Sequence, residues 1–156
     1  MAKFAEHTTV SVEKSRAEIE RLLSRYGAKA FGYMATDTQA TLAFQASERH
    51  IRFSLKLPPE SDFARDGRRQ LRTPDKRRDA REAACRRLWR ALCLVIKAKL
   101  EAVASGVSVF EDEFMAHIVL PSGLTVSEEV RPRIAAAYEG NTVPLLPNYT
   151  SKKDGQ

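Results

Sequence analysis

The sequence has only two cysteines, and it has no long apolar run. Two cysteines cannot form the disulfide framework of a small secreted domain, which indicates a reducing compartment. No apolar stretch approaches the roughly 20 residues that cross a bilayer. The first ten residues, MAKFAEHTTV, lack the apolar core of a secretory signal. We therefore expect a cytoplasmic protein that does not enter a membrane.

Sequence motifs for common enzyme chemistry are also missing. The chain has no glycine-rich phosphate loop, no Walker pattern and no Gly-x-Ser-x-Gly nucleophile motif. Its three histidines, His7, His50 and His117, lie far apart and outside any metal-ligand spacing. The acidic run at 111–113 is explained by negative charge at the start of a helix. We therefore predict no catalytic residue, no metal ligand and no cofactor.

One enzymatic alternative stays open. Cys85 or Cys93 would act as a nucleophile with His117 as its base if the fold brought the two groups together. Free cysteines on the apolar stripe of a helix are usually core residues. Eight helical residues separate the two cysteines by roughly 12 Å, which is too far for a disulfide. We rank an enzyme third among the classes of function.

Positive charge is gathered in the middle of the chain. The net charge is +6, yet residues 65–90 alone carry eleven Lys and Arg against four Asp and Glu. Residues 101–140 carry seven acidic residues against two basic ones. This uneven distribution gives the middle segment the charge that a polyanion binds.

The basic segment combines a loop with the start of a helix. Residues 60–73 are polar and rich in arginine, and Thr73-Pro74-Asp75 predicts a helix start. Clustered cations release counterions from a polyanion when they neutralise its phosphates. The predicted nucleic-acid contacts are Arg65, Arg68, Arg69, Arg72, Lys76, Arg77, Arg78, Arg81, Arg86, Arg87 and Arg90. The simpler interpretation is a solvated helix face and a mobile loop, with ion pairs to Asp75, Asp79 and Glu82.

The periodicity of the apolar residues predicts an α+β domain. A helical stripe runs from Val12 to about Tyr26 after a capping Ser11, and alternation predicts strands over 30–35, 41–46 and 50–57. The expected fold is a three-stranded antiparallel meander packed on the N-terminal helix and a long central helix, with a small C-terminal helical cap. We expect one domain over 11–147, an irregular arm over 1–10 and a flexible tail over 148–156.

The strand pattern assigns one face of the sheet to the core. The aromatic residues expected inside are Phe31, Tyr33, Phe44 and Phe53. The outer face therefore lacks the exposed rings on which single-stranded nucleic acid stacks. On that outer face, His50, Arg52 and Lys56 are expected to extend the basic surface.

The central helix is expected from Pro74 to about Ala104, with Ser105-Gly106 as its stop. At about 1.5 Å per residue, this is a rod of roughly 46 Å. Trp89 and Leu94 widen its apolar stripe beyond what one small sheet covers. We therefore expect the helix to pack on a second copy of the chain as well, which makes the protein a homo-oligomer.

The C-terminal elements are expected to be short. Ser108 and Glu111 fit a capping box before a helix over 110–116, and Pro121-Ser122-Gly123 fits a tight hairpin turn. Thr125 or Ser127 begins a last helix that ends near Glu139. The Pro-Leu-Leu-Pro run at 144–147 is expected to dock on the domain.

The run LWRALCLVIKAKLEAVASGVSVFEDEFMAHIVLPSGLTVSEEV, at 88–130, resembles a family of short uncharacterised proteins from phage and prophage genomes. The likeness extends back through VEKSRAEIERLLSRYGA, at 12–28, and forward to PLLP. It implies a phage genome, and hence the cytoplasm of a host cell, and it implies no mechanism.

The order helix, three-stranded meander, helix is also that of a double-stranded-RNA-binding domain, which presents basic residues to phosphates. Arg77, Arg78 and Arg81 lie at a comparable place. The chain differs from that domain in its long central helix, its extra C-terminal elements and the lack of a characteristic loop motif between strands. The likeness is therefore one of layout.

The leading interpretation is a non-enzymatic nucleic-acid-binding accessory protein of phage type. Contacts made mainly to phosphates give binding that is weakly sequence-specific and sensitive to salt. The alternative is a protein-interaction module that inhibits a host defence or transcription complex. In that case the arginines meet an acidic protein surface.

Overall fold

A computed structural model describes residues 8–139 of the chain. Its helices are α1 (Val12–Arg25), α2 (Pro74–Ala104), α3 (Phe110–Phe114) and α4 (Val126–Tyr138). Its strands are β1 (Ala30–Ala35), β2 (Gln39–Ala46) and β3 (Arg49–Lys56), and two short 3₁₀ turns are η1 (Glu60–Phe63) and η2 (Met115–His117). The predicted α+β class and antiparallel meander are confirmed.

The described residues leave out parts of the expected domain plan. Most of the arm over 1–10, the tail over 148–156 and the Pro-Leu-Leu-Pro run at 144–147 lie outside them. Between residues 8 and 139, no helix combines the length and the apolar content needed to span a membrane.

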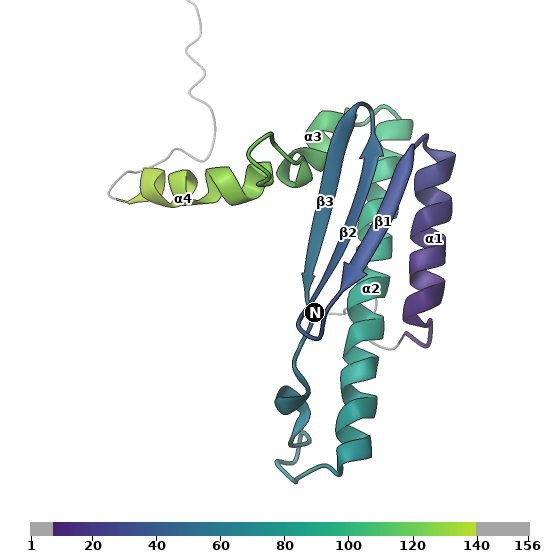
Figure 1. The fold of residues 1–156 in the computed structure, drawn as a ribbon, viewed down its shortest axis with the longest axis vertical. Helices are drawn as coiled ribbons and strands as arrows, with labels where there is room; N and C mark the ends of the chain where they lie inside the picture. Colours follow the sequence, from purple (N-terminus) through teal and green to yellow (C-terminus); the bar gives the residue numbers. More distant parts are fainter. Residues whose placement is uncertain (1–7, 140–156) are drawn as a thin grey trace, which may run out of the picture.

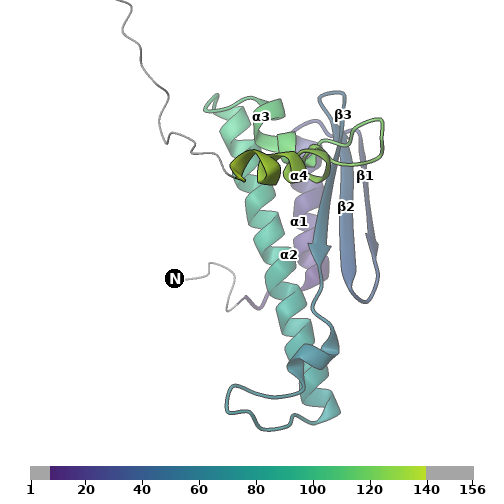
Figure 2. The same ribbon diagram turned by 90° about the vertical axis from the view of Figure 1, so that its left-hand side faces the viewer.

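The sheet has one packed face and one open face. In its register, Phe44 of β2 lies opposite Phe31 of β1 and Ile51 of β3, so the three side chains point to the same side. Helices α1 and α2 cover that side, and Figure 2 shows the opposite face without a covering helix. The open face is therefore available to solvent.

The core lies between the sheet and the two long helices. Trp89, Leu92 and Ile96 of α2 are buried, and so are the residues that face them from the sheet. Phe114 of α3 closes one end, where its ring meets that of Phe44 edge to face with centroids 5.9 Å apart. Since Trp89 is covered by its own chain, it does not widen the stripe of α2 toward a second copy, and self-association stays a prediction.

Tyr33 is an exception to the expected core, and that prediction is wrong. Its side chain is 52% exposed. β1 forms the edge of the sheet and pairs only with β2, so the helices shield its inward residues less than those of β2. The guanidinium of Arg16 from α1 lies over the Tyr33 ring instead, 4.1 Å from its centroid.

The capping box expected at Ser108 is also absent. Helix α3 begins at Phe110 with Val109 as its N-cap, and no side chain caps it. A capping box occurs at Thr125 and Glu128, where each side chain accepts from the other residue's backbone N–H. Of the two starts considered for the last helix, the structure has Thr125.

Helix α4 extends away from the domain body, as Figure 1 shows. None of its residues is buried. Its first turn is tied to β3 by an ion pair of 2.8 Å between Arg52 and Glu128. The segment before it also joins the sheet, because the backbone N–H of Val119 donates to the carbonyl of His50 over 2.8 Å.

Candidate nucleic-acid interface

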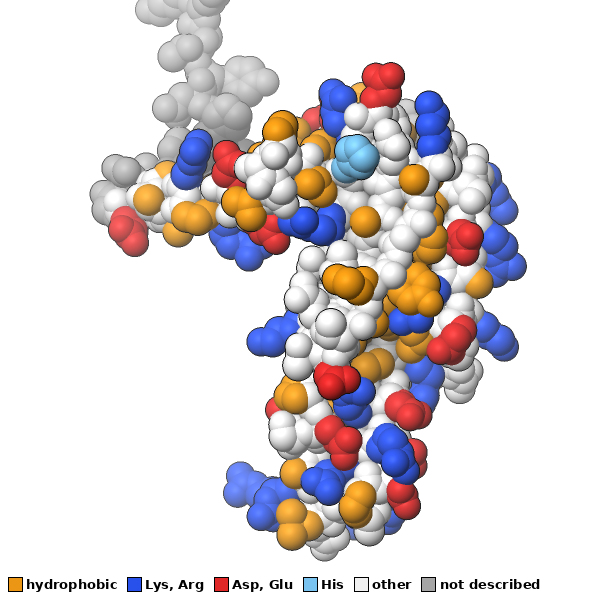
Figure 3. All heavy atoms as spheres, viewed as in Figure 1, with side chains coloured by type: hydrophobic (Ala, Val, Ile, Leu, Met, Phe, Trp, Pro, Cys, Tyr) orange, Lys and Arg blue, Asp and Glu red, His pale blue; other side chains and the backbone are white. Residues whose placement is uncertain are grey.

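Helix α2 is longer than the sheet that it covers. Figure 1 shows its N-terminal turns projecting beyond the strands, beside η1 and the loop that follows η1. Figure 3 shows Lys and Arg side chains gathered on this projecting part. We call residues 64–87 the basic end; they include every predicted contact except Arg90.

The loop of the basic end is an ordered hairpin. Arg65 and Leu71 form an antiparallel bridge. The backbone N–H of Arg72 donates to the carbonyl of Ala64 over 2.9 Å, and that of Asp66 donates to Gln70 over 2.9 Å. The loop is therefore held by backbone hydrogen bonds, and the main chain at its arginines has a defined position.

Asp66 organises the tip of this hairpin. Its Oδ1 accepts from the backbone N–H groups of Arg68, over 2.8 Å, and Gln70, over 2.9 Å. Arg69 has a φ of 63°, the left-handed conformation that such a tight turn requires. Asp66, the one acid within residues 64–73, thus binds backbone amides rather than a guanidinium, and the side chains of Arg68 and Arg69 remain exposed.

Three of the predicted arginines hold the basic end together. Arg65 donates to the carbonyl of Arg69 over 2.9 Å, and Arg72 donates to that of Arg65 over 2.6 Å. Arg81 reaches the carbonyl of Asp37, in the turn between β1 and β2, over 2.6 Å. Because carbonyls carry no net charge, these arginines keep their positive charge while their hydrogen bonds connect separate backbone segments.

Two other predicted arginines form ion pairs. Arg78 meets Asp75 at 2.5 Å, with both side chains well exposed, so this pair contributes little to stability. Arg90 meets Glu18 of α1 at 2.6 Å in a partly buried position. This hydrogen bond holds the pKa of Glu18 below its ordinary value. Arg90 therefore joins α1 to α2, and its charge is neutralised.

The remaining predicted side chains have no hydrogen bond or ion pair to any residue between 8 and 139. They are Arg68, Arg69, Lys76, Arg77, Arg86 and Arg87. Of the acids expected to pair with the cluster, only Asp75 does so within these residues. The Nε of Arg77 is buried without a partner.

The start of α2 adds a fixed dipole to these charges. The Thr73 hydroxyl caps the helix by accepting from the N–H of Lys76 over 3.4 Å, and Pro74 occupies the first turn, as predicted. The free N–H groups of a helix start are equivalent to a partial positive charge, which attracts an anion.

The open sheet face adds less charge than expected. Arg52 is paired with Glu128, so of the three residues named for this face only Lys56 is an unpaired cation among the described residues.

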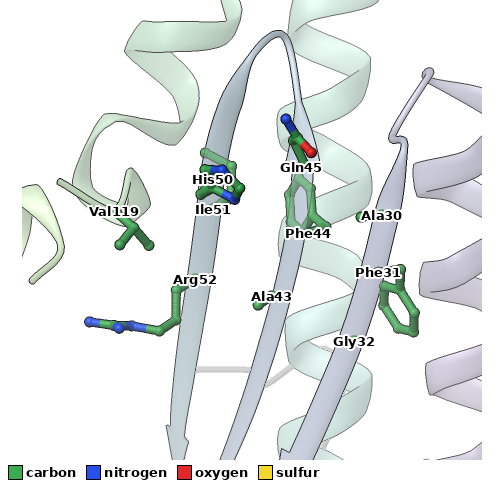
Figure 4. A pocket seen from close by; sticks show the side chains of 10 residues that line it. All are labelled: Ala30, Phe31, Gly32, Ala43, Phe44, Gln45, His50, Ile51, Arg52 and Val119. Atoms are coloured by element: carbon green, nitrogen blue, oxygen red, sulfur yellow. The ribbon is translucent and has the colours of Figure 1, made fainter. Parts of the chain in front are cut away.

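A shallow hollow of about 480 Å³ lies on this face (Figure 4), with a floor of small residues at Ala30, Gly32 and Ala43. Within the part of the chain that the structure describes, the lining includes His50 and contains no carboxylate or thiol.

The enzymatic alternative gains no support from the cysteines. Burial raises the pKa of the Cys93 thiol to about 11, so the thiol is protonated near neutral pH. His117 stacks on Phe53 with ring centroids 3.9 Å apart. Within residues 8–139, no hydrogen bond joins His117 to a cysteine, and no cluster of metal-ligating side chains occurs.

Arg16 was not indicated by the sequence. Its guanidinium lies 4.1 Å from the Tyr33 ring centroid and 4.5 Å from the Trp89 ring centroid, and its Nε is buried without a hydrogen bond. The helical spacing of α1 places Arg16 beside the apolar stripe, but nothing in that spacing indicates the two rings.

Comparison of the chain with protein-family models, with curated proteins and with solved structures finds no match. The proposed function therefore rests on the contacts and charges described above.

Proposed function

We propose that this protein binds nucleic acid through the basic end, mainly by contacts to phosphates. The observation that carries the proposal is a set of six basic side chains, on the hairpin tip and α2, that have no hydrogen-bond or ion-pair partner within residues 8–139. Arg65, Arg72 and Arg81 donate to backbone carbonyls, which do not neutralise them, so they add to the positive charge. A polyanion that covers this surface releases its condensed counterions, and that release drives binding.

The surface favours positioning on a backbone over recognition of a base sequence. Arginine and lysine contacts to phosphates carry no sequence information. Only one uncharged amide side chain, Gln70, lies within residues 64–87. We therefore infer an accessory role in which affinity depends on salt more than on sequence.

The test is binding of labelled DNA and RNA oligonucleotides, single- and double-stranded, by fluorescence anisotropy at several salt concentrations. Each phosphate contact contributes about −0.9 to the slope of log K against log salt for duplex DNA. The double variant Arg68→Ala, Arg69→Ala is expected to weaken binding and to reduce that slope by about 1.8. No binding to any oligonucleotide, or an unchanged slope in this variant, contradicts the proposal.

A matched control removes the same charge elsewhere. Arg21 and Arg25 are exposed on α1, away from the hairpin. The double variant Arg21→Ala, Arg25→Ala lowers the net charge by the same amount. It is expected to leave the salt slope nearly unchanged, because long-range charge alone is screened within about 10 Å at 0.1 M salt.

One observation favours the protein-interaction alternative. Leu71 is 73% exposed, although it lies in the hairpin among the arginines. The buried centre of a protein interface is apolar and interfaces are enriched in arginine, so an exposed leucine among arginines fits a protein partner as well. The neutral variant Leu71→Gln distinguishes the two functions: nucleic-acid affinity is retained if phosphates are the ligand, whereas an acidic protein partner is lost.

A further inference from the structure

We propose that the ligand of the basic end is double-stranded rather than single-stranded nucleic acid. This inference rests on the proposed function and names its substrate class. It follows from three features of the basic end: the absence of stacking rings, the projecting shape and the fixed spacing of its cations.

Single strands are bound largely by stacking of their bases on aromatic side chains. The exposed aromatic residues between 8 and 139 are Tyr33 and Tyr138, and neither lies in the basic end. Tyr33 is on β1, where the guanidinium of Arg16 from α1 covers its ring. Tyr138 is the last residue of α4, which extends away from the domain body (Figure 1). Next to the basic end, Phe63 is half-buried and Trp89 is buried. The basic end therefore lacks the groups that hold unpaired bases.

The shape of the basic end also suits a duplex. Proteins that hold single strands track the backbone along a positively charged groove. Here the cations lie on a projection formed by α2 and the hairpin, as Figures 1 and 3 show. The hollow on the open sheet face (Figure 4) lies elsewhere, and its single arginine, Arg52, is paired with Glu128. A projecting surface contacts a rod-shaped duplex from outside without enclosing it.

Helix α2 fixes the backbone spacing of two cations that have no partner among the described residues. Lys76 and Arg87 are eleven residues apart, which is close to three helical turns, so both lie on the same face of α2. The distance between them along the axis is about 16 Å at 1.5 Å per residue. The major groove of duplex DNA is about 12 Å wide. The two side chains therefore reach phosphates on both sides of one groove.

The hairpin supplies a second fixed group of cations beside the helix. Asp66 holds the backbone of the tip through its two amide contacts, so the main chain at Arg68 and Arg69 loses little additional freedom on binding, and only their side chains have to be ordered. A preformed array matches phosphates that are themselves held at regular positions. A flexible single strand has to be ordered on the same array, and without stacking nothing offsets the cost of that ordering.

The experiment compares a DNA duplex, an RNA duplex and each of their separate strands with the full chain at the same salt concentration. Binding of at least one duplex is expected to be about tenfold or more tighter than binding of its strands, since duplex backbones carry the denser counterion layer. Tighter binding of the DNA duplex or of the RNA duplex identifies which duplex supplies the phosphates. Either result supports binding of a duplex, but only the DNA duplex has the wide major groove to which the spacing of Lys76 and Arg87 was compared.

Equal or tighter binding of single strands overturns the duplex inference while leaving nucleic-acid binding intact. Absence of binding to any of these duplexes and strands contradicts the proposed function itself. The variants Lys76→Ala and Arg87→Ala are expected to reduce the preference for the duplex, whereas Tyr33→Leu and Tyr138→Leu are expected to preserve it. Tighter binding of single strands that is lost in the tyrosine variants shows that stacking on Tyr33 or Tyr138, and not the basic end, selects the ligand.

Discussion

Arg81 donates from Nη2 to the backbone carbonyl of Asp37 over 2.6 Å, and so connects the third turn of α2 to the turn between β1 and β2. Its Nε donates to the carbonyl of Pro58 over 3.1 Å. One guanidinium thus fixes two loops against the projecting part of α2. Among the predicted contact residues, Arg81 connects parts of the fold by hydrogen bonds and also supplies positive charge.

Replacement of Arg81 is therefore expected to affect folding before it affects binding. Arg81→Ala leaves two carbonyls without their donor, and we expect a loss of about 1–2 kcal/mol in the free energy of unfolding. Urea denaturation measures this loss, with Arg87→Ala as the matched control. An Arg81→Ala protein that is as stable as the wild type, while its salt slope falls by a full contact, shows that the side chain is a ligand contact only.

Asp66 separates the effect of order from the effect of charge. Asp66→Ala makes the basic end more positive but removes the acceptor of two backbone amides. If the ordered hairpin matters, affinity for nucleic acid falls despite the added charge. Asp66→Asn keeps an acceptor oxygen and also removes the negative charge, so its affinity is expected to rise. Fluorescence anisotropy at one salt concentration measures the affinity of both variants. Tighter binding by Asp66→Ala than by the wild type shows that binding does not require the ordered hairpin.

Arg16 is expected to be visible in the fluorescence of the protein. Trp89 is the only tryptophan, and the Arg16 guanidinium lies 4.5 Å from its ring centroid. Arg16→Gln removes the cation from both rings, which is expected to lower the free energy of unfolding by about 1 kcal/mol and to change the tryptophan emission. Arg21→Gln, on the same helix, serves as the control. Identical emission spectra for the wild type and Arg16→Gln contradict the contact.

His117 predicts a pH dependence of stability. Burial lowers its pKa below the ordinary value of 6.5, the charge of Lys99 lowers it further, and a hydrogen bond to the Arg52 backbone partly opposes both. The unfolded chain therefore binds the proton more readily than the folded chain does. The contribution of the neutral His117 ring to the free energy of unfolding is fully present above pH 6.5. It is lost as the pH falls from 6.5 through the pKa of His117 in the folded protein.

The variant His117→Phe keeps a ring against Phe53 and removes the titration. Its stability is expected to be flatter than that of the wild type just below pH 6.5. Glu18 contributes in a separate range, because its lowered pKa places its loss of stability below 4.5. Urea midpoints at closely spaced pH values check the prediction, and parallel curves for the two proteins contradict it.

Several expectations stay predictions, because the fold does not test them. They are the likeness to phage proteins, the location in the cytoplasm and the pairing of α2 with a second copy. Val95 of α2 is 45% exposed, and Ile134 of α4 is 53% exposed. Light scattering across a range of concentrations would measure whether two copies cover these side chains.

Local chemistry determined the elements of this fold. Ser11 and Thr73 cap α1 and α2 as their positions predict, and α2 ends at Ala104 before Ser105-Gly106. The alternation of β3 correctly placed Ile51 and Phe53 in the core. Each of these features depends on neighbours within a few residues, which is why a single sequence is sufficient to predict them.

The sequence by itself determined that the charge is gathered between residues 65 and 90, and on which elements it lies. Only the tertiary structure decided what each cation does. Arg90 is neutralised by Glu18, 72 residues away, and Arg81 is held by a carbonyl 44 residues away. The exposure of Tyr33 likewise depends on the position of β1 at the sheet edge. The physical reason is the same in each case: the partner of a long side chain is set by the packing of distant elements, which no local pattern encodes.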